Sequence, residues 1–283
     1  MTFDAVGRGS GEHARPGTTP APAARPFDSV SSFSPPRSTS VRSTTAEQFA
    51  PILRVHTDVL SGCSPSVDAD TARRRMASGQ VAYDALRMLR SCGDLLPRFV
   101  RVLDAFEVAG LVSNENRRAI LDGELDVDDL VSGWFTGDRT PRDARRQIAR
   151  QAAIVVGNAL LRAATELVGP ASVWRDWTRV VCPCCGGAPD IALVERGGQR
   201  TLVCARCDAQ WRAPRAGCLG CETIEPPGIA RISNPELGYD LMMCNACGRF
   251  LKERPRRGLE SLIVERALTT ELDLAAEQRG LRI

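Results

Sequence analysis

The sequence predicts an α+β fold, in which an N-terminal α-helical bundle precedes two small cysteine-rich β modules and a C-terminal helix. Three observations support this prediction. Apolar residues recur at helical spacing between residues 44 and 168. Eight of the eleven cysteines then fall into four Cys-x-x-Cys pairs between residues 182 and 247. Helical periodicity returns over residues 257–279.

The same observations divide the chain into five segments. Residues 1–43 are rich in Pro, Ser, Thr, Gly and Arg. This composition has too few apolar side chains to offset the entropy of an ordered chain, so a disordered tail is predicted. An α-helical domain is expected over 44–178, a first four-cysteine module over 179–216, a second over 217–254, and a C-terminal helix over 255–283.

The first helix of the bundle is expected to begin near Thr44. Thr44 and Glu47 have the spacing of a capping box, in which each side chain satisfies a free backbone N–H group of the other residue. Turns containing Gly and Asn then separate further helical patterns. These patterns predict helices over residues 69–90, 96–109, 115–122 and 126–135.

The most regular helical pattern covers residues 141–168. Thr140 suits the N-cap and Pro141 suits the first helical position, while Gly169-Pro170 would end the helix. Apolar residues lie on several faces of this helix. We therefore expect it to run through the centre of the bundle.

The cysteine pairs have the spacing of metal-binding turns, since two thiolates separated by two residues can hold one ion. Between the second and third pairs lie only 10 residues, whereas 18 separate the first pair from the second and 22 the third from the fourth. These intervals favour two sequential four-cysteine sites of the rubredoxin-like or zinc-ribbon type, and a cross-braced pairing remains the alternative. The eight predicted ligands are Cys182, Cys185, Cys204, Cys207, Cys218, Cys221, Cys244 and Cys247.

Other residues support sites made of sulfur alone. Gly186 and Gly248 each follow a cysteine pair and can adopt a positive φ, which lets the backbone turn around the sulfurs. The two histidines, His13 and His56, lie far from the cysteines in the sequence. Four thiolates suit zinc or mononuclear iron and leave no open position for a substrate. Short strands are predicted between the pairs, over residues 192–195, 200–203, 210–212, 228–233 and 241–243.

The composition indicates a cytoplasmic protein without a membrane span. The sequence contains no run of about eighteen apolar residues and begins with no apolar export signal. Paired cysteines in a reducing compartment bind metal instead of forming disulfides. The bundle shows no nucleotide-binding loop or catalytic triad, so an enzyme is not expected. We interpret Cys63, Cys92, Cys184, Trp134, Trp174 and Trp177 as packing residues, although the tryptophans could border a partner-binding cleft near Arg175 and Arg179.

The cysteine region resembles the formate dehydrogenase accessory protein (FdhE) family. The matching stretches are Cys182-Pro-Cys-Cys-Gly-Gly-Ala-Pro189, Leu202-Val-Cys-Ala-Arg-Cys207 with Trp211, Cys218-Leu-Gly-Cys221, Cys244-Asn-Ala-Cys-Gly-Arg-Phe-Leu-Lys252 and Leu272-Asp-Leu-Ala-Ala-Glu277 with Gly280. The resemblance implies a cytoplasmic, non-enzymatic accessory protein with tandem rubredoxin-like modules. It implies iron in the cysteine sites, and binding of the formate dehydrogenase catalytic subunit during maturation.

Two other functions are compatible with the same cysteines. A nucleic-acid-binding zinc ribbon needs a basic surface, and Arg254, Arg256 and Arg257 form a candidate patch. However, residues 178–257 carry 12 basic and 8 acidic residues, and two four-thiolate sites would bring this net +4 to about zero. A dithiol oxidoreductase would use Cys182 and Cys185, but no helix is expected after that pair to lower their pKa. Rubredoxin-like electron transfer or redox sensing by bound iron remains open.

Overall fold

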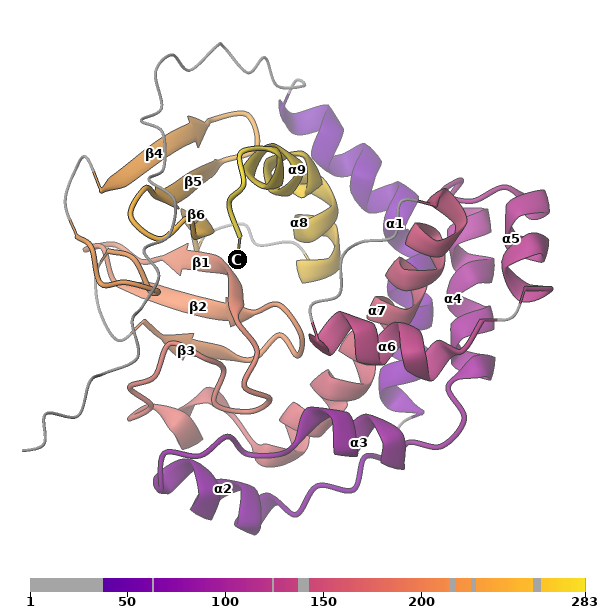
Figure 1. Cartoon of the computed structure of the whole chain (residues 1–283), viewed down its shortest axis with the longest axis horizontal. Helices are drawn as coiled ribbons and strands as arrows, with labels where there is room; N and C mark the ends of the chain where they lie inside the picture. Colours follow the sequence, from indigo (N-terminus) through magenta and orange to yellow (C-terminus); the bar gives the residue numbers. More distant parts are fainter. Residues whose placement is uncertain are drawn as a thin grey trace, which may run out of the picture.

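A computed structural model describes residues 38–62, 64–123, 125–136, 143–213, 217–224, 228–256 and 261–282. The predicted disordered tail lies outside these residues, except for its last six, which belong to the first helix. The bundle contains α1 (Ser38–Ser61), α2 (Ala69–Ala77), α3 (Ala85–Ser91), α4 (Leu96–Val108), α5 (Asn114–Leu121), α6 (Val127–Thr136) and α7 (Ala144–Val168), followed by the short η1 (Ala171–Trp174). Figure 1 shows α1 and α4–α7 to the right of the β-sheet, and α2 and α3 below it.

The helix α7 is the axis of the bundle, as its apolar pattern predicts. It contacts α1, α2, α3, α4, α5 and α6. Small residues along α7 allow the neighbouring helices to approach it closely. At Gly157, for example, an added Cβ would lie 2.8 Å from the ring of Trp134 on α6. The helix ends at Gly169, which has a φ of +125°, as predicted. Its N-cap is Asp143, whose side chain accepts from the Arg146 N–H, while Thr140 and Pro141 lie outside the described residues.

Besides the start of α7, predicted at residue 141 and observed at Ala144, two other helix predictions are wrong. The first helix begins at Ser38, so Thr44 lies inside it and forms no capping box with Glu47. Several Ser and Thr residues precede Thr44, and each offers an equally good local cap signal. The helix predicted over 69–90 is two helices, because α2 ends at Ser78 and Gly79, where φ is +76°.

The six strands form one continuous sheet. They are β1 (Pro189–Val194), β2 (Arg200–Cys204), β3 (Gln210–Arg212), β4 (Ile229–Asn234), β5 (Tyr239–Cys244) and β6 (Phe250–Pro255), in the spatial order β3-β2-β1-β6-β5-β4. All neighbours are antiparallel except β1 and β6, which pair in parallel with Ile191 opposite Lys252. The two cysteine-rich modules therefore join edge to edge as halves of one sheet. The strand β6 was missed by the sequence analysis.

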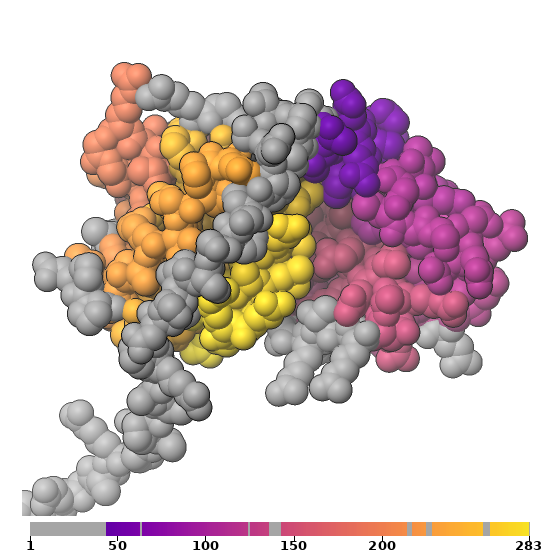
Figure 2. Space-filling model, turned by 90° about the horizontal axis from the view of Figure 1, so that it is seen from above, coloured from indigo at the N-terminus to yellow at the C-terminus, as the bar shows by residue number. Residues whose placement is uncertain are grey.

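The C-terminal segment forms two helices instead of one. These helices are α8 (Leu262–Leu268) and α9 (Thr270–Gln278), and they meet at Thr269. Seen from another side in Figure 2, the yellow C-terminal segment lies between the orange strands and the bundle. Beneath α8 and α9 lie two buried apolar clusters, formed by Ile191, Leu193, Val203, Leu237, Tyr239, Leu262 and Leu272 and by Leu241, Met243, Phe250, Ala276 and Leu281. A larger buried cluster continues from the bundle into the sheet.

Charged side chains are buried between β6 and the C-terminal helices. Lys252, the single lysine of the chain, is 1% exposed and donates to Thr269 Oγ1 at 3.1 Å and to Asp273 Oδ2 at 2.8 Å. Burial raises the pKa of Asp273, and the positive charge of Lys252 partly offsets this rise. Next along the strand, Glu253 pairs with Arg200 at 3.0 Å. These contacts explain how a strand as polar as β6 can be buried.

We predict that Lys252→Met lowers the free energy of unfolding by about 2–4 kcal/mol, because it leaves the Asp273 carboxylate largely buried without its cation. Urea denaturation at constant metal content measures the effect. The double variant Lys252→Met/Asp273→Leu should regain most of this loss, since no charge is then left unpaired. Equal stability of the single and double variants would contradict the account.

Candidate metal centres

The four cysteine pairs have the same backbone turn. In each turn the residue after the second cysteine donates its N–H to the carbonyl of the first cysteine, over 2.9–3.3 Å. That residue has a positive φ in every turn: +74° at Gly186, +59° at Asp208, +69° at Glu222 and +69° at Gly248. A positive φ was predicted for the two glycines. Asp208 and Glu222 were missed, although they occupy the equivalent position after a Cys-x-x-Cys pair.

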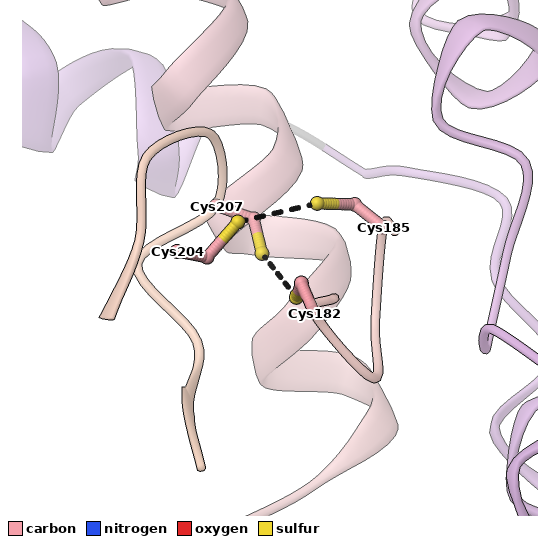
Figure 3. A group of neighbouring side chains, drawn as sticks. All are labelled: Cys182, Cys185, Cys204 and Cys207. Carbon is pink, nitrogen blue, oxygen red and sulfur yellow. Dashed lines mark hydrogen bonds between the residues drawn. The ribbon is translucent and has the colours of Figure 1, made fainter. Parts of the chain in front are cut away.

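The turns bring the eight cysteines together as two groups of four sulfurs. In the first group, Cys182 Sγ lies 3.5 Å from Cys207 Sγ, and Cys185 Sγ lies 3.5 Å from Cys204 Sγ (Figure 3). In the second group, Cys218 Sγ lies 3.5 Å from Cys247 Sγ, and Cys221 Sγ lies 3.4 Å from Cys244 Sγ. All four sulfurs of each group lie within 4.8 Å of one another. The grouping is sequential, so the structure does not follow the cross-braced alternative.

These distances fit a tetrahedral ion better than a disulfide. Four sulfurs about 2.3 Å from a central ion lie about 3.8 Å apart, whereas a disulfide bond is about 2.0 Å long. The described cysteines form no disulfides. A bound zinc or iron ion would be held by the four thiolates of each group and would neutralise their charge. Each group could therefore hold one metal ion, and the ligand role of the eight cysteines stays a prediction.

Backbone N–H groups are aimed at the sulfurs. The Cys184 N–H donates to Cys182 Sγ at 3.3 Å, the Arg206 N–H to Cys204 Sγ at 3.4 Å, and the Gly220 N–H to Cys218 Sγ at 3.2 Å. Such donors partly compensate the negative charge of a thiolate and orient it toward an ion.

The metal-free thiols differ in their affinity for protons. Burial raises the pKa of Cys182, and it raises the pKa of Cys247 to about 12. By contrast, the hydroxyl of Thr223, 3.2 Å from Cys221 Sγ, lowers the pKa of Cys221 to about 6. A cation has to replace the protons of the buried thiols, so metal binding should release protons and weaken as the pH falls.

The bundle holds the first group in place through backbone pairing. The chain between α2 and α3 lies against the Cys182–Cys185 turn: the Ala82 N–H donates to the Pro183 carbonyl at 2.8 Å, and the Tyr83 N–H donates to the Cys184 carbonyl at 3.2 Å. The Tyr83 hydroxyl in turn bonds to the Leu161 carbonyl on α7 at 3.0 Å. The sequence analysis missed the break between α2 and α3. This break provides the non-helical segment that covers the turn.

A polar chain from α1 and α7 holds the second turn of the same group. Burial lowers the pKa of His56, so its ring is neutral at pH 7 and its Nε2 can donate to Asn158 Oδ1, 2.7 Å away. Asn158 Nδ2 then donates to the Arg206 carbonyl at 3.0 Å and to Asp208 Oδ1 at 3.2 Å. The structure thus buries His56 with a hydrogen-bond partner and not as a member of a cysteine group.

Arg266 on α8 completes this support. It donates to Asp208 Oδ1 at 2.8 Å, to Asp190 Oδ2 at 2.7 Å and to the Cys204 carbonyl at 2.9 Å. The residues of this hydrogen-bond network come from α1, α7, β1, α8 and the cysteine turn. Because they are far apart in the sequence, no local pattern could have identified them.

The other cysteines lie outside the two groups. Cys184 is buried but is not among the four sulfurs of the first group. Cys92 is half-buried, and its thiol contacts the Met88 carbonyl at 3.4 Å, while Cys63 lies outside the described residues. The Cys182–Cys185 turn is followed by β1 and not by a helix, which disfavours a redox-active dithiol.

The tryptophans serve packing, as predicted. Trp174 and Trp177 are buried, and their ring N–H groups donate to the Gln210 carbonyl at 2.9 Å and to the Val181 carbonyl at 2.8 Å. Trp134 is half-buried against Gly157. Since the rings of Trp174 and Trp177 are enclosed, these two residues offer no open surface to a partner.

Comparisons with known proteins point to one family. Residues 181–215, which include the first cysteine group, match the model of the FdhE central domain. A protein FdhE homolog from Glaesserella parasuis is 29% identical over 108 residues, which make up 36% of this chain and 35% of the relative. Another from Pasteurella multocida is 25% identical over 107 residues, again 36% and 35% of the two chains. The chain thus matches these curated relatives over about a third of their length.

The fold has a solved counterpart. The crystal structure of the FdhE protein from Pseudomonas aeruginosa superposes with a TM-score of 0.59 over 87% of this chain and 96% of that chain, at 16% sequence identity. This similarity extends beyond the cysteine region and confirms the predicted α+β fold. The family model and the curated relatives thus show similarity to FdhE proteins in the cysteine region, and the crystal structure shows a shared fold.

We predict that the purified protein binds two metal ions per chain, each held by four sulfurs. Elemental analysis counts the ions, and X-ray absorption identifies the ligands and should give metal–sulfur distances of about 2.3 Å if the ion is zinc. One ion per chain, or nitrogen and oxygen ligands at both sites, would refute this assignment.

Cys204→Ser should unfold the β region, because it removes a ligand from a site whose binding energy, about 10–16 kcal/mol for structural zinc, supports the local fold. Limited proteolysis should then cut between the β strands. Cys92→Ser and Cys184→Ser serve as controls and should keep the protease resistance of the unaltered protein. If the ligand variant resisted proteolysis equally well, the metal would have no structural role.

Proposed function

We propose that this chain is a cytoplasmic accessory protein that binds the catalytic subunit of a formate dehydrogenase and assists its maturation, without turnover of its own. The observation that carries the proposal is the match of residues 181–215 to the FdhE central domain, since these residues build the first four-sulfur group. The relatives named above are FdhE homologues, and the fold extends the similarity to the helical bundle.

The metal ions would support this function by fixing the shape of the β region. With four thiolates as ligands, an ion has no free position for a substrate, which suits a structural or sensing role. Zinc and iron both accept such a ligand set. No helix in the described part of the chain is long and apolar enough to cross a membrane.

Nucleic-acid binding is less well supported. In the candidate basic patch, Arg254 pairs with the buried Glu265, and Arg256 pairs with Glu195 at 3.0 Å. Arg257 lies outside the described residues. Arginines already paired with carboxylates contribute little to the counterion release that drives binding to phosphates.

Deletion of the gene should abolish formate-dependent dye reduction in cells that carry the formate dehydrogenase genes. Expression of the intact protein should restore it, and so should the control variant Cys92→Ser. A variant with Cys182 and Cys185 both changed to Ser should fail. Normal enzyme activity in the deletion strain would reject the proposed function.

Direct binding is tested separately, by co-purification of the catalytic subunit with the tagged protein from the same cells. The proposal expects the subunit with the intact chain and with Cys92→Ser, and much less of it with the double cysteine variant. Recovery of activity without any detectable complex would contradict the binding step.

A further inference from the structure

The two four-sulfur groups have the same turns but different surroundings. In the first group, the exposed fractions of Cys182, Cys185, Cys204 and Cys207 are 0%, 7%, 0% and 1%. In the second group, Cys218 and Cys244 are equally buried, but Cys221 is exposed and Cys247 is half-buried. The first group is therefore shielded from solvent, whereas the second group is open to it at Cys221.

Protein covers the first group from several directions. The chain between α2 and α3 pairs with the Cys182–Cys185 turn, and Asn158 on α7 holds the other turn through the Arg206 carbonyl. The Arg206 side chain lies over the Phe135 ring, 4.3 Å from its centroid, and donates to the Phe135 carbonyl at 3.1 Å. An incoming ligand would have to displace the segment between α2 and α3, or parts of α7 or α8, before reaching these sulfurs.

The second group is held by residues of the β region and of the C-terminal segment. The Cys244–Cys247 turn is held by the C-terminus, where the Arg282 N–H donates to the Gly248 carbonyl at 2.8 Å. The Cys218–Cys221 turn is held at its start, where Arg200 donates to the Gly217 carbonyl at 2.9 Å. After this turn come the exposed residues Glu222 and Ile224, the latter 65% exposed.

An exposed arginine borders the second group. A Cβ added at Gly220 would lie 2.5 Å from Arg249 Cδ and 3.3 Å from Cys247 Sγ. The Arg249 side chain therefore crosses the Cys218–Cys221 turn beside the sulfurs. Unlike Arg206, which packs on the bundle, Arg249 lies at the protein surface. Because Cys221 itself is exposed, a reagent can approach it without any change in the packing of the helices.

We propose that the first group is a permanent structural metal site and that the second is an exchangeable site, opened at Cys221. In the exchange, the bond between the ion and Cys221 Sγ breaks, and a sulfur or nitrogen donor of an incoming ligand bonds to the ion. The released thiolate takes a proton from water. Loss of the remaining three bonds then transfers the ion to a chelator, with no change of oxidation state.

The proposal depends on metal binding by the cysteines but not on the formate dehydrogenase partner. Release of the ion is measured with the purified chain alone. Failure of the partner experiments would therefore leave this inference intact, and failure of the exchange experiment would leave the accessory role untouched.

The test uses the full chain loaded with two equivalents of zinc and challenged with an excess of a chromogenic chelator. One equivalent should be released at least about tenfold faster than the other, because exchange at the first group requires local unfolding. Cys221→Ser should remove the equivalent that is released fast, whereas Cys92→Ser should keep both phases. Release of both equivalents at one rate would overturn the proposal.

A second measurement does not depend on how the variants fold. The unaltered protein is treated with iodoacetamide during zinc release, and the modified cysteines are located by mass spectrometry. Labelling in the fast phase should fall on Cys221 and its group, and the first group should be labelled only in the slow phase. Early labelling of Cys182 or Cys207 would show that the first group is the exchangeable one and would refute the assignment.

Discussion

Four thiols packed within 4.8 Å of one another, at two places, are the constraint on which the β region depends. Thiolates this close repel one another, and burying them without a cation is costly. A soft divalent ion removes both penalties and adds its own bonds to the folded state. The turns are built for this purpose, since a positive φ after each pair and N–H groups directed at the sulfurs prepare the ligand geometry.

The first group also connects the two halves of the molecule. One of its turns pairs with the segment before α3, and the other is held by Asn158 on α7 and Arg266 on α8. Disruption of the group should therefore loosen contacts in the bundle as well as in the sheet. The second group has two cysteines that are not fully buried, and its turns are held by Arg200 and by Arg282, so loss of a metal there would have smaller consequences for the bundle.

Features encoded locally could be predicted from the sequence. The pair spacing gave the two groups, the interval lengths favoured their sequential order, and Gly169 marked the end of α7. The strand β6 was missed because Lys252, Glu253 and Arg254 look like surface residues, and only partners such as Asp273 and Glu265 explain their burial. The supports of the first group were missed for the same reason, since Arg266 meets Asp190 across 76 residues of sequence.

Amide hydrogen exchange, compared between the metal-loaded and the metal-stripped full chain, tests the central claim most directly. If metal at the first group joins the bundle to the sheet, removal of the metal should abolish protection at Ala82 and Tyr83 together with protection in the Cys182–Cys185 turn, because these backbones are bonded to each other. Protection at Ala82 and Tyr83 that survived while the cysteine turns became fully exposed would contradict the account.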